Sequence, residues 1–300
     1  MKKNKNKKLP LVSVILNCYN SAKFLKKSIK SVIAQSYKNW ELVIFDNCSN
    51  DNTKLEVLKF KKNKKIKYFK SKKLVNLYHA RNLAIKKTNG SLITFLDADD
   101  WWLKNKLKKQ VNFLEKNKNS NIVYTNLFLF NEIKNKIKLF SKDSLYNGNI
   151  TQSLLNKFKM PILTTMIRKK IFLKNKFDKR YSIIGDFDLF VRISLKEKIF
   201  SIQEPLAYYR IHSSNMTTKK IDLNIKELEK WLSEHHNKIF FKNYDFSNIK
   251  KIIQTLKIKK YFNSGKLIKA FFELFKKPFN PLNFKYIFFL FLPKKIIEKI

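Results

Sequence analysis

A short apolar run that ends directly in acids is the feature that most constrains this chain. Residues 92–96 (Leu-Ile-Thr-Phe-Leu) are apolar or β-branched, which predicts a central strand covered on both faces. Three carboxylates follow within four residues, from Asp97, Asp99 and Asp100. Ligands collect beyond the carboxyl ends of parallel strands, and adjacent carboxylates repel one another unless a cation or a proton compensates. We therefore expect a metal site here. The alternative is that Asp99 or Asp100 caps a helix from Leu103 to about Lys118.

Strand-like and helix-like segments alternate through residues 11–125. The expected strands are residues 11–16, 42–45, 66–69, 92–96 and 122–125. Between the first two, Leu25, Ile29 and Val32 recur at helical spacing, which predicts a βαβ unit with a right-handed connection. The predicted fold class is α/β, with a mostly parallel Rossmann-like sheet flanked by helices. We expect one domain over residues 1–218 and a helical, basic C-terminal region over 219–300.

Composition excludes some classes of protein. With 44% hydrophobic and 14% aromatic residues the chain can bury a large core, so disorder is not expected. The net charge of +43 would ordinarily indicate nucleic acid or an anionic membrane. Lys, Asn, Ile and Phe abound throughout, however, as the codon usage of an AT-rich genome produces. No nucleic-acid-binding motif is recognisable, so we expect no nucleic-acid partner.

Cysteines and apolar runs bear on where the protein works. Cys18 and Cys48 are too few and too far apart for a disulfide framework or a zinc site, which favours a reducing cytoplasm. The apolar stretch after the N-terminal lysines lacks a cleavage site and reads as a strand rather than a signal peptide. The longest apolar run, Tyr286 to Leu292, is far shorter than the ~20 residues that span a bilayer. We expect a cytoplasmic protein without a transmembrane helix.

A second acid follows another apolar strand. Asp46 ends the expected strand at 42–45, beside Asn17 at the end of the first strand if the two strands pair. These side chains could hydrogen-bond a base or a ribose. For Asn50 to Asn52 we favour a turn that caps a helix from about Thr53.

Residues 183–192 form a third segment with acidic side chains. Gly185 marks the entry of a helix and Asp186 lies in its first turn, where the helix dipole helps to keep a carboxylate ionised. An ionised carboxylate can serve as a base. Asp188 could equally pair with Arg192 at i,i+4, a routine surface arrangement.

Five segments in this order resemble a known family. They are VSVILNCYN (12–20), ELVIFDNCSNDNT (41–53), HARNLAIKKTNGSLITFLDADDWW (79–102), GDFDLFVRI (185–193) and AYYRIHSSNMT (207–217). Together they closely resemble the inverting family 2 glycosyltransferases with the GT-A fold, over roughly residues 10–218. The resemblance implies transfer of a sugar from a nucleotide-sugar donor to an acceptor hydroxyl, with Mg²⁺ or Mn²⁺ and no covalent enzyme intermediate.

The resemblance also implies roles for the acids. Asp99 would coordinate the metal that bridges the donor's two phosphates, and Asp97 would orient that metal or hold the donor's ribose or sugar. Asp186 matches the catalytic base, which takes the proton from the acceptor hydroxyl. Because Asp97, Asp99 and Asp186 are all present, the resemblance favours an enzyme over an inactive scaffold.

The remaining implied positions surround these acids. The nucleoside and donor side comprises Asn17, Asp46, Asn47 and Arg81, and the acceptor and diphosphate side comprises Tyr209, Arg210 and His212. His212 would contact diphosphate or acceptor, or be structural.

Trp101 and Trp102 would shape the sugar subsite or pack in the core. The chain departs from the family pattern at Asn47, where an acid is usual, and at Asn52, where the usual residue is Gly. These departures leave the nucleotide base open. Gly185 stands where Glu is usual, while the base position keeps Asp186.

The C-terminal region lies outside the resemblance. Residues 250–300 carry thirteen Lys and two Glu, a net charge of +11, interleaved with residues such as Phe271, Phe272, Phe275 and Phe279. This pattern is typical of a basic amphipathic helix on an anionic membrane surface, where a lipid-linked saccharide acceptor would be met. A small packed helical subdomain is the alternative. The family and the basic tail favour a role in surface polysaccharide or lipopolysaccharide synthesis, peripheral on the cytoplasmic face of the membrane.

Overall fold

The computed structural model describes residues 9–213 and 220–276, which form two compact units. The first comprises residues 9–154 and 158–213, and the second comprises residues 155–157 and 220–276. The expected boundary at residue 218 falls outside the described residues, so the division into 1–218 and 219–300 stays a prediction.

The first half of the first unit alternates strands and helices. Its elements are β1 (Val12–Cys18), α1 (Ala22–Ile33), β2 (Trp40–Asp46), α2 (Thr53–Leu58), β3 (Ile66–Lys70), α3 (Leu77–Ile85) and β4 (Leu92–Asp97). Strand β1 pairs in parallel with β2 and β4, and β2 pairs in parallel with β3. All residues of β1 and β2 are buried, as their apolar runs predict. The predicted α/β class is confirmed.

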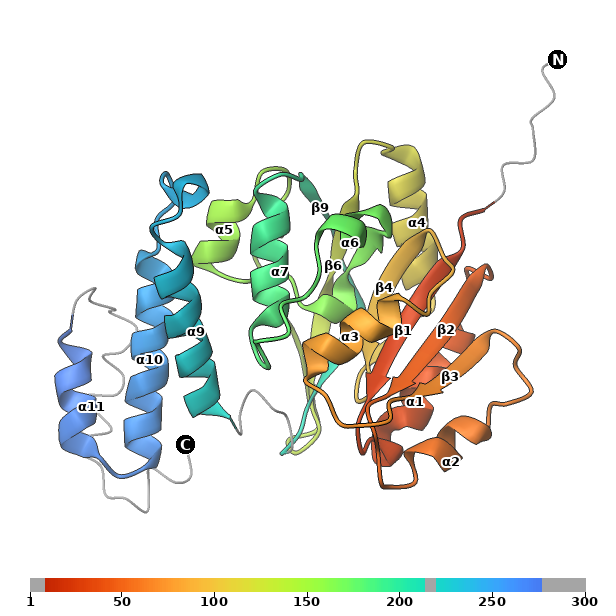
Figure 1. Cartoon of the computed structure of the whole chain (residues 1–300), viewed down its shortest axis with the longest axis horizontal. Helices are drawn as coiled ribbons and strands as arrows, with labels where there is room; N and C mark the ends of the chain where they lie inside the picture. Colours follow the sequence, from red (N-terminus) through yellow and green to blue (C-terminus); the bar gives the residue numbers. More distant parts are fainter. Residues whose placement is uncertain (1–8, 214–219, 277–300) are drawn as a thin grey trace. The chain divides into compact units, whose positions relative to one another are not determined.

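The second half of this unit extends the sheet. Its elements are β5 (Trp101–Trp102), α4 (Lys106–Lys116), β6 (Ile122–Asn131), β7 (Lys136–Leu139), α5 (Thr151–Asn156), a 3₁₀ turn (Ile162–Thr164), β8 (Met166–Arg168), α6 (Lys170–Lys174), α7 (Gly185–Ser194) and β9 (Ile199–Ile211). The strand order is β3-β2-β1-β4-β8-β6-β9-β5, with β7 on β6. Figure 1 shows β3, β2, β1 and β4 side by side. Strand β8 is antiparallel to β4 and β6, so the sheet is mixed beyond β4.

Helices cover both faces of the sheet because side chains along each strand alternate between faces. Val14, Leu16 and Leu96 share a core cluster with apolar residues of α1, α2 and α4. Phe95 faces the other way and packs edge-on against Phe172, at a ring-centroid distance of 5.9 Å, and against Phe177, at 5.7 Å. Apolar side chains therefore cover both faces of the central strands, and Asn17, Asp46 and Asp97 lie at or near the strand ends.

Two helix starts test the capping predictions. Helix α4 begins at Lys106 after the N-cap residue Asn105, so the alternative that Asp99 or Asp100 caps it is wrong. These acids lie in the turn between β4 and β5 instead. Helix α2 begins at Thr53, as expected, and the cap comes from Asp51, whose Oδ1 accepts a hydrogen bond from the Thr53 amide at 2.9 Å.

The second unit is helical. It contains α9 (Ile221–His235), a 3₁₀ turn (Ile239–Phe241), α10 (Ser247–Asn263) and α11 (Leu267–Leu274), with α10 packed against both α9 and α11. The expected helical character is confirmed for residues 220–276. Phe279 and the apolar run Tyr286 to Leu292 lie outside the described residues. Among the helices that the structure describes, none combines the length and apolarity that crossing a membrane requires.

Candidate active site

The carboxyl edge of the parallel strands places Asn17 among acids. Asn17 on β1 is the register neighbour of Asp97 on β4, and the next β1 residue, Cys18, is the neighbour of Asp46 on β2. Asn17 is buried, and neither polar atom of its carboxamide has a hydrogen-bond partner within residues 9–213 and 220–276. Because a buried unpaired amide costs free energy, this side chain is well suited to a polar ligand.

The turn after β4 is fastened from two sides. The buried Ser28 hydroxyl on α1 lies 2.7 Å from the Ala98 carbonyl oxygen and 2.6 Å from that of Asp100. The Asp100 side chain is itself buried, and its Oδ1 accepts a hydrogen bond from the Arg210 amide at 2.8 Å. Burial, together with the nearby charges of Asp99 and Asp97, raises the pKa of Asp100 well above its usual range. Asp100 Oδ1 therefore ties the turn to β9, while its buried Oδ2 has no hydrogen-bond partner within residues 9–213 and 220–276.

Asp97 and Asp99 are the carboxylates of this turn that remain partly exposed. The Arg81 guanidinium on α3 lies 2.7 Å from Asp97 Oδ1. Asp99 Oδ2 lies 2.9 Å from Nε2 of His212. Burial and the like charge of Asp97 raise the pKa of Asp99, and the contact with His212 opposes that rise. A cation between these carboxylates would favour their ionised forms.

The donor set fits a hard divalent cation. Within residues 9–213 and 220–276, no group of three or more His, Cys, Asp and Glu side chains converges on one point. Mg²⁺ is commonly held by one or two carboxylates together with substrate phosphates and water. Asp97 and Asp99 therefore fit Mg²⁺ or Mn²⁺ that takes its other oxygens from a diphosphate.

Strand β9 brings the predicted acceptor-side residues to this turn. The Arg210 Nε donates to the Asp99 carbonyl oxygen at 2.9 Å, and its guanidinium pairs with Glu132 at 2.8 Å. The ring of Phe24 lies 4.7 Å from that of His212 and 4.9 Å from the Arg210 guanidinium carbon. Arg210 and His212 thus lie at the acidic turn, and their contact with a diphosphate or an acceptor stays a prediction.

Most aromatic residues near the acidic turn pack against other side chains of the first unit. Tyr209 packs against the core cluster on α1 and α4. Trp102 is buried in that cluster and donates a hydrogen bond to the Leu163 carbonyl at 3.1 Å, in line with the core alternative. Trp101 stacks on Tyr208 at a centroid distance of 4.7 Å.

Asp46 and Asn47 have internal partners. Asp46 Oδ1 accepts from the Ser49 amide at 2.8 Å, and its Oδ2 accepts from the Tyr68 hydroxyl at 2.5 Å. The Asn47 carboxamide exchanges two hydrogen bonds with the backbone of Val75. Both side chains therefore shape the loops at this edge. Their contact with a nucleoside stays a prediction.

Asp186 lies in the first turn of α7, as expected. Its Oδ1 accepts from the Phe187 amide at 3.0 Å and lies 3.2 Å from the Tyr78 hydroxyl on α3. Burial raises the pKa of Asp186, and the positive charge of Arg81 opposes that rise. The buried Asp188 pairs with Arg192 at 2.6 Å, which confirms the predicted i,i+4 pair.

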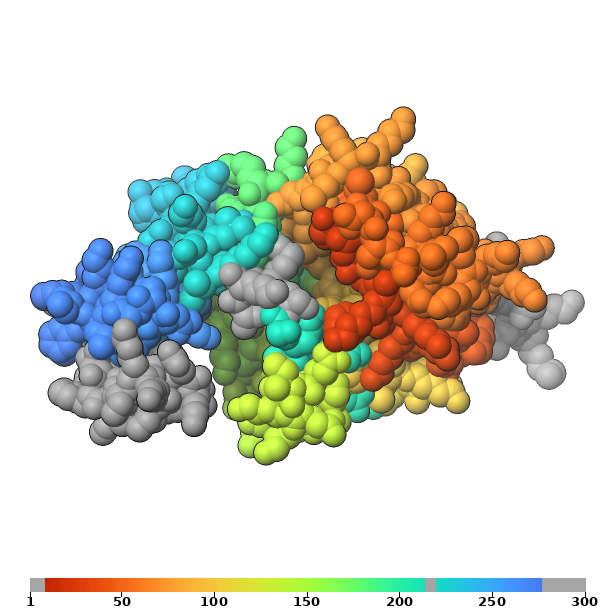
Figure 2. All heavy atoms as spheres, turned by 90° about the horizontal axis from the view of Figure 1, so that it is seen from below, coloured from red at the N-terminus to blue at the C-terminus, as the bar shows by residue number. Residues whose placement is uncertain are grey.

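Sequence reasoning did not find Ser28 and Tyr78. Neither lies in a motif with recognisable spacing, and each acts through a contact that only the fold creates. Figure 2 shows the first unit from below, with the red N-terminal segments and the yellow-green β6–β7 segment on the visible face.

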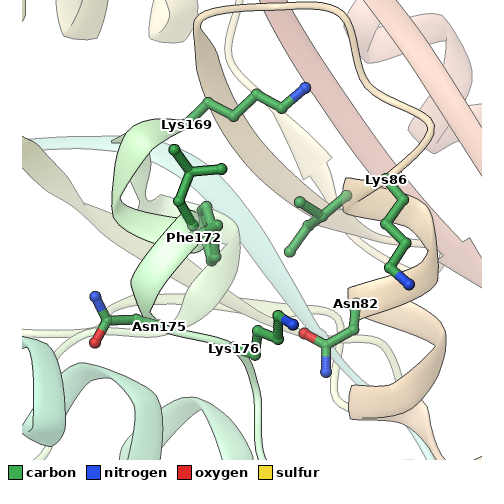
Figure 3. A pocket seen from close by; sticks show the side chains of 8 residues that line it. Asn82, Lys86, Lys169, Phe172, Asn175 and Lys176 are labelled. Atoms are coloured by element: carbon green, nitrogen blue, oxygen red, sulfur yellow. The ribbon is translucent and has the colours of Figure 1, made fainter.

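A separate pocket of about 310 Å³ lies between α3 and α6 and contains none of the predicted site residues (Figure 3). Phe172 and Leu173 form part of its apolar lining, and Lys86, Lys169 and Lys176 also line it. The ring of Phe177 stacks on that of Phe172 at a centroid distance of 6.2 Å and on that of Tyr78 at 5.5 Å. This pocket therefore adjoins the packing that supports the Tyr78 ring.

Comparison with known proteins connects this site to a family. The family model described as glycosyl transferase family 2 matches residues 13–182. The chain is 32% identical over 222 residues to the Escherichia coli UDP-Glc:α-D-GlcNAc-diphosphoundecaprenol β-1,3-glucosyltransferase WfgD, which covers 73% of this chain and 83% of WfgD.

An uncharacterised glycosyltransferase of Rickettsia conorii is 34% identical over 206 residues, covering 69% of this chain. The match spans only 34% of that relative and 29% of a second one from Rickettsia bellii.

Solved structures share the fold at low identity. The S. aureus TarS 1–349 structure in complex with UDP-GlcNAc has a TM-score of 0.58 and 16% identity, covering 84% of this chain and 72% of that one. The mannosyltransferase PcManGT from Pyrobaculum calidifontis, in complex with GDP-Man and Mn²⁺, has a TM-score of 0.60 and 14% identity, covering 88% and 74%. The fold is accordingly that of GT-A glycosyltransferases.

Proposed function

The chain belongs to glycosyl transferase family 2, and we propose that it transfers a sugar from a nucleoside-diphosphate sugar to an acceptor hydroxyl with inversion at the anomeric carbon. One observation carries this proposal. Helix α3 contacts both acidic places at once, because Arg81 pairs with Asp97 while Tyr78, three residues earlier, reaches Asp186. One helix therefore contacts both Asp97, at the proposed donor site, and Asp186, the candidate base.

The donor would lie at the carboxyl edge of β1 and β4. The unpaired Asn17 carboxamide offers a donor and an acceptor to the nucleoside. Asp97 and Asp99 would hold Mg²⁺ or Mn²⁺ on the diphosphate, and such a cation neutralises charge on a departing diphosphate. His212, in contact with Asp99, is placed beside that charge.

Asp186 would act as the base. Its carboxylate takes the proton from the acceptor hydroxyl as that oxygen forms a bond to the anomeric carbon. The bond from the anomeric carbon to the diphosphate oxygen breaks on the opposite face, and the nucleoside diphosphate leaves with the electron pair. Attack opposite the leaving group gives inversion, and the step needs no covalent intermediate with the enzyme.

We propose a lipid-linked saccharide diphosphate as the acceptor class, in the synthesis of a surface polysaccharide or lipopolysaccharide. The likeness to WfgD supports this class. A feature of the second unit also supports it. Helix α11 and the residue after it expose Ile268, Phe271, Phe272 and Phe275, with Lys269 beside them, a combination suited to an anionic membrane surface.

Donor binding tests the proposal first. Thermal unfolding is followed with UDP-glucose, UDP-GlcNAc and GDP-mannose, each with and without Mn²⁺. A ligand at 100 times its Kd stabilises the folded state by about 2.7 kcal/mol, so one nucleotide sugar should raise the Tm in a Mn²⁺-dependent way. D99A should lose the Mn²⁺-dependent part of this rise.

Turnover tests the base. D186N should keep the rise in Tm but lose transfer to a GlcNAc-diphosphate-lipid acceptor. The matched control is D178N, which makes the same change at an acid that pairs locally with Arg180. Normal turnover by D186N would contradict the assignment of the base, and the absence of any Mn²⁺-dependent rise would contradict the donor site.

A further inference from the structure

Gly185 lies directly against the ring of Tyr78. A Cβ at position 185 would lie 2.4 Å from Cδ2 and 2.5 Å from Cε2 of that ring. Such distances are far inside van der Waals contact, so no larger residue fits while the ring stays in place. The departure from the usual Glu at this position thus has a physical reason in this chain.

The Tyr78 ring is held on several sides. Its side chain is buried, it stacks on Phe177 at 5.5 Å, and the Arg81 guanidinium carbon lies 5.3 Å from its centroid. The backbone amide of Tyr78 donates to the Asn76 side chain, which caps α3. The ring therefore has one defined position, and these contacts also fix the position of its hydroxyl group.

The Tyr78 hydroxyl lies at the start of α7. The single hydrogen of the Tyr78 hydroxyl is shared between the Ile183 carbonyl oxygen, at 2.8 Å, and Asp186 Oδ1, at 3.2 Å. Within residues 9–213 and 220–276, both hydrogen bonds of the Asp186 carboxylate go to Oδ1. The contacts from Tyr78 and the Phe187 amide thus fix one carboxylate oxygen and leave the other for a substrate.

We propose that Tyr78 is a positioning residue for the Asp186 carboxylate, and that Gly185 provides the space that the Tyr78 ring needs for this role. The inference rests on the proposed function of Asp186 as the base. It adds the group that sets the orientation of that base and the residue that makes the arrangement possible.

Charges around Asp186 agree with this role. Burial raises the pKa of Asp186, as does the negative charge of Asp97. The Arg81 charge, the Phe187 amide and the Tyr78 hydroxyl all lower it. A hydrogen bond to an ionised group is among the stronger ones, so loss of the hydroxyl disfavours the ionised base.

The test compares Y78F with a matched control, Y124F. Tyr124 is also fully buried, and its hydroxyl bonds to the Tyr146 carbonyl rather than to an acid. In Y78F we expect the acidic limb of the kcat profile to move to higher pH and kcat to fall about tenfold, the equivalent of ~1.4 kcal/mol, with the donor KM within about twofold. Y124F should leave the pH profile unchanged. Equal profiles for Y78F and the unaltered protein would overturn the proposal.

Two further measurements separate this inference from the base assignment. In the D186N background, Y78F should cause no additional loss of turnover. If D186N itself turns over normally, the base assignment fails, and the Tyr78–Asp186 contact is judged without substrate by carboxyl ¹³C titration of Asp186. Y78F should shift that titration to higher pH, and an unchanged titration would overturn the contact.

The role of Gly185 is tested by stability alone. G185A should lower the Tm in the protein with Tyr78 and should lower it much less in the Y78S background, where the ring is gone. Additive effects of the two substitutions would overturn the spatial argument.

Discussion

Removing the Ser28 hydroxyl should loosen the turn that carries the acids. Ser28 is fully buried on α1, and its one hydroxyl hydrogen is shared between the carbonyl oxygens of Ala98 and Asp100. In S28A both carbonyls lose this donor. Leaving buried acceptors unpaired costs about 1–3 kcal/mol, and we expect a loss of about 2 kcal/mol. For a unit of about 200 residues this lowers the Tm by roughly 4–8 °C.

The assay is urea unfolding followed by the fluorescence of the tryptophans, together with calorimetry. The matched control is S31A on the same helix, whose hydroxyl bonds only to the Ser28 carbonyl within that helix, at 2.7 Å. We expect S31A to change the free energy of unfolding by less than about 0.5 kcal/mol. S28A should also reduce the Mn²⁺-dependent stabilisation by nucleotide sugar, because the acids are held less firmly.

Equal stability of S28A and S31A would refute the argument that Ser28 fastens the turn. A loss of stability in S28A with unchanged Mn²⁺-dependent binding would refute the link between the turn's rigidity and the metal site.

Two other predictions concern a buried cation and an exposed face. The Lys106 ammonium is buried, with hydrogen bonds to Thr94 and Gln110, and burial lowers its pKa well below 10.5. Between the lowered pKa and 10.5 the unfolded chain binds more protons, so stability should rise with pH in that window. K106M should remove this rise between about pH 7 and 9.5 in urea unfolding, and parallel curves for the two proteins would contradict it. In liposome flotation, a triple substitution to Ser at Phe271, Phe272 and Phe275 should reduce binding to anionic vesicles; a triple substitution to Ser at Ile133, Ile137 and Leu173, which are also exposed, should not. Equal partitioning of the two variants would contradict a membrane role for α11.

The sequence predicts the half of the sheet built from continuous apolar runs. Strands β1, β2, β3 and β4 lie within one or two residues of their expected bounds because their apolar or half-buried segments are bounded by polar turns. Strand β9 has no such signal. Gln203 and Glu204 are exposed in its middle, and its pairing with β6 is broken by register shifts after Thr125 and Asn126. The formation and register of such a strand depend on its pairing with a neighbouring strand rather than on its own sequence pattern.

The candidate site also has a part that the sequence predicts and a part that it does not. Asp97, Asp99 and Asp186 follow from their places at strand and helix ends, and the structure bears out those places. The resemblance placed Arg81 and His212 near the acids, but the pairing of Arg81 with Asp97, of His212 with Asp99 and of Tyr78 with Asp186 depends on the fold. Asp46 and Asn47 show the same pattern. Their position was foreseen, and their internal hydrogen bonds to Tyr68 and Val75 were not.

The hydrogen bond between the Arg210 amide and Asp100 joins two parts of the site that are synthesised at different times. The two residues lie 110 positions apart, and the family match ends at residue 182, before Arg210 and His212. On a ribosome that adds about 5–20 residues per second, β9 emerges roughly 5–20 s after the acids. During that interval the Arg210 and His212 partners of the acidic turn have not yet been synthesised. The nascent chain therefore presents its carboxylates to solvent well before it can hold them in the geometry of the finished site.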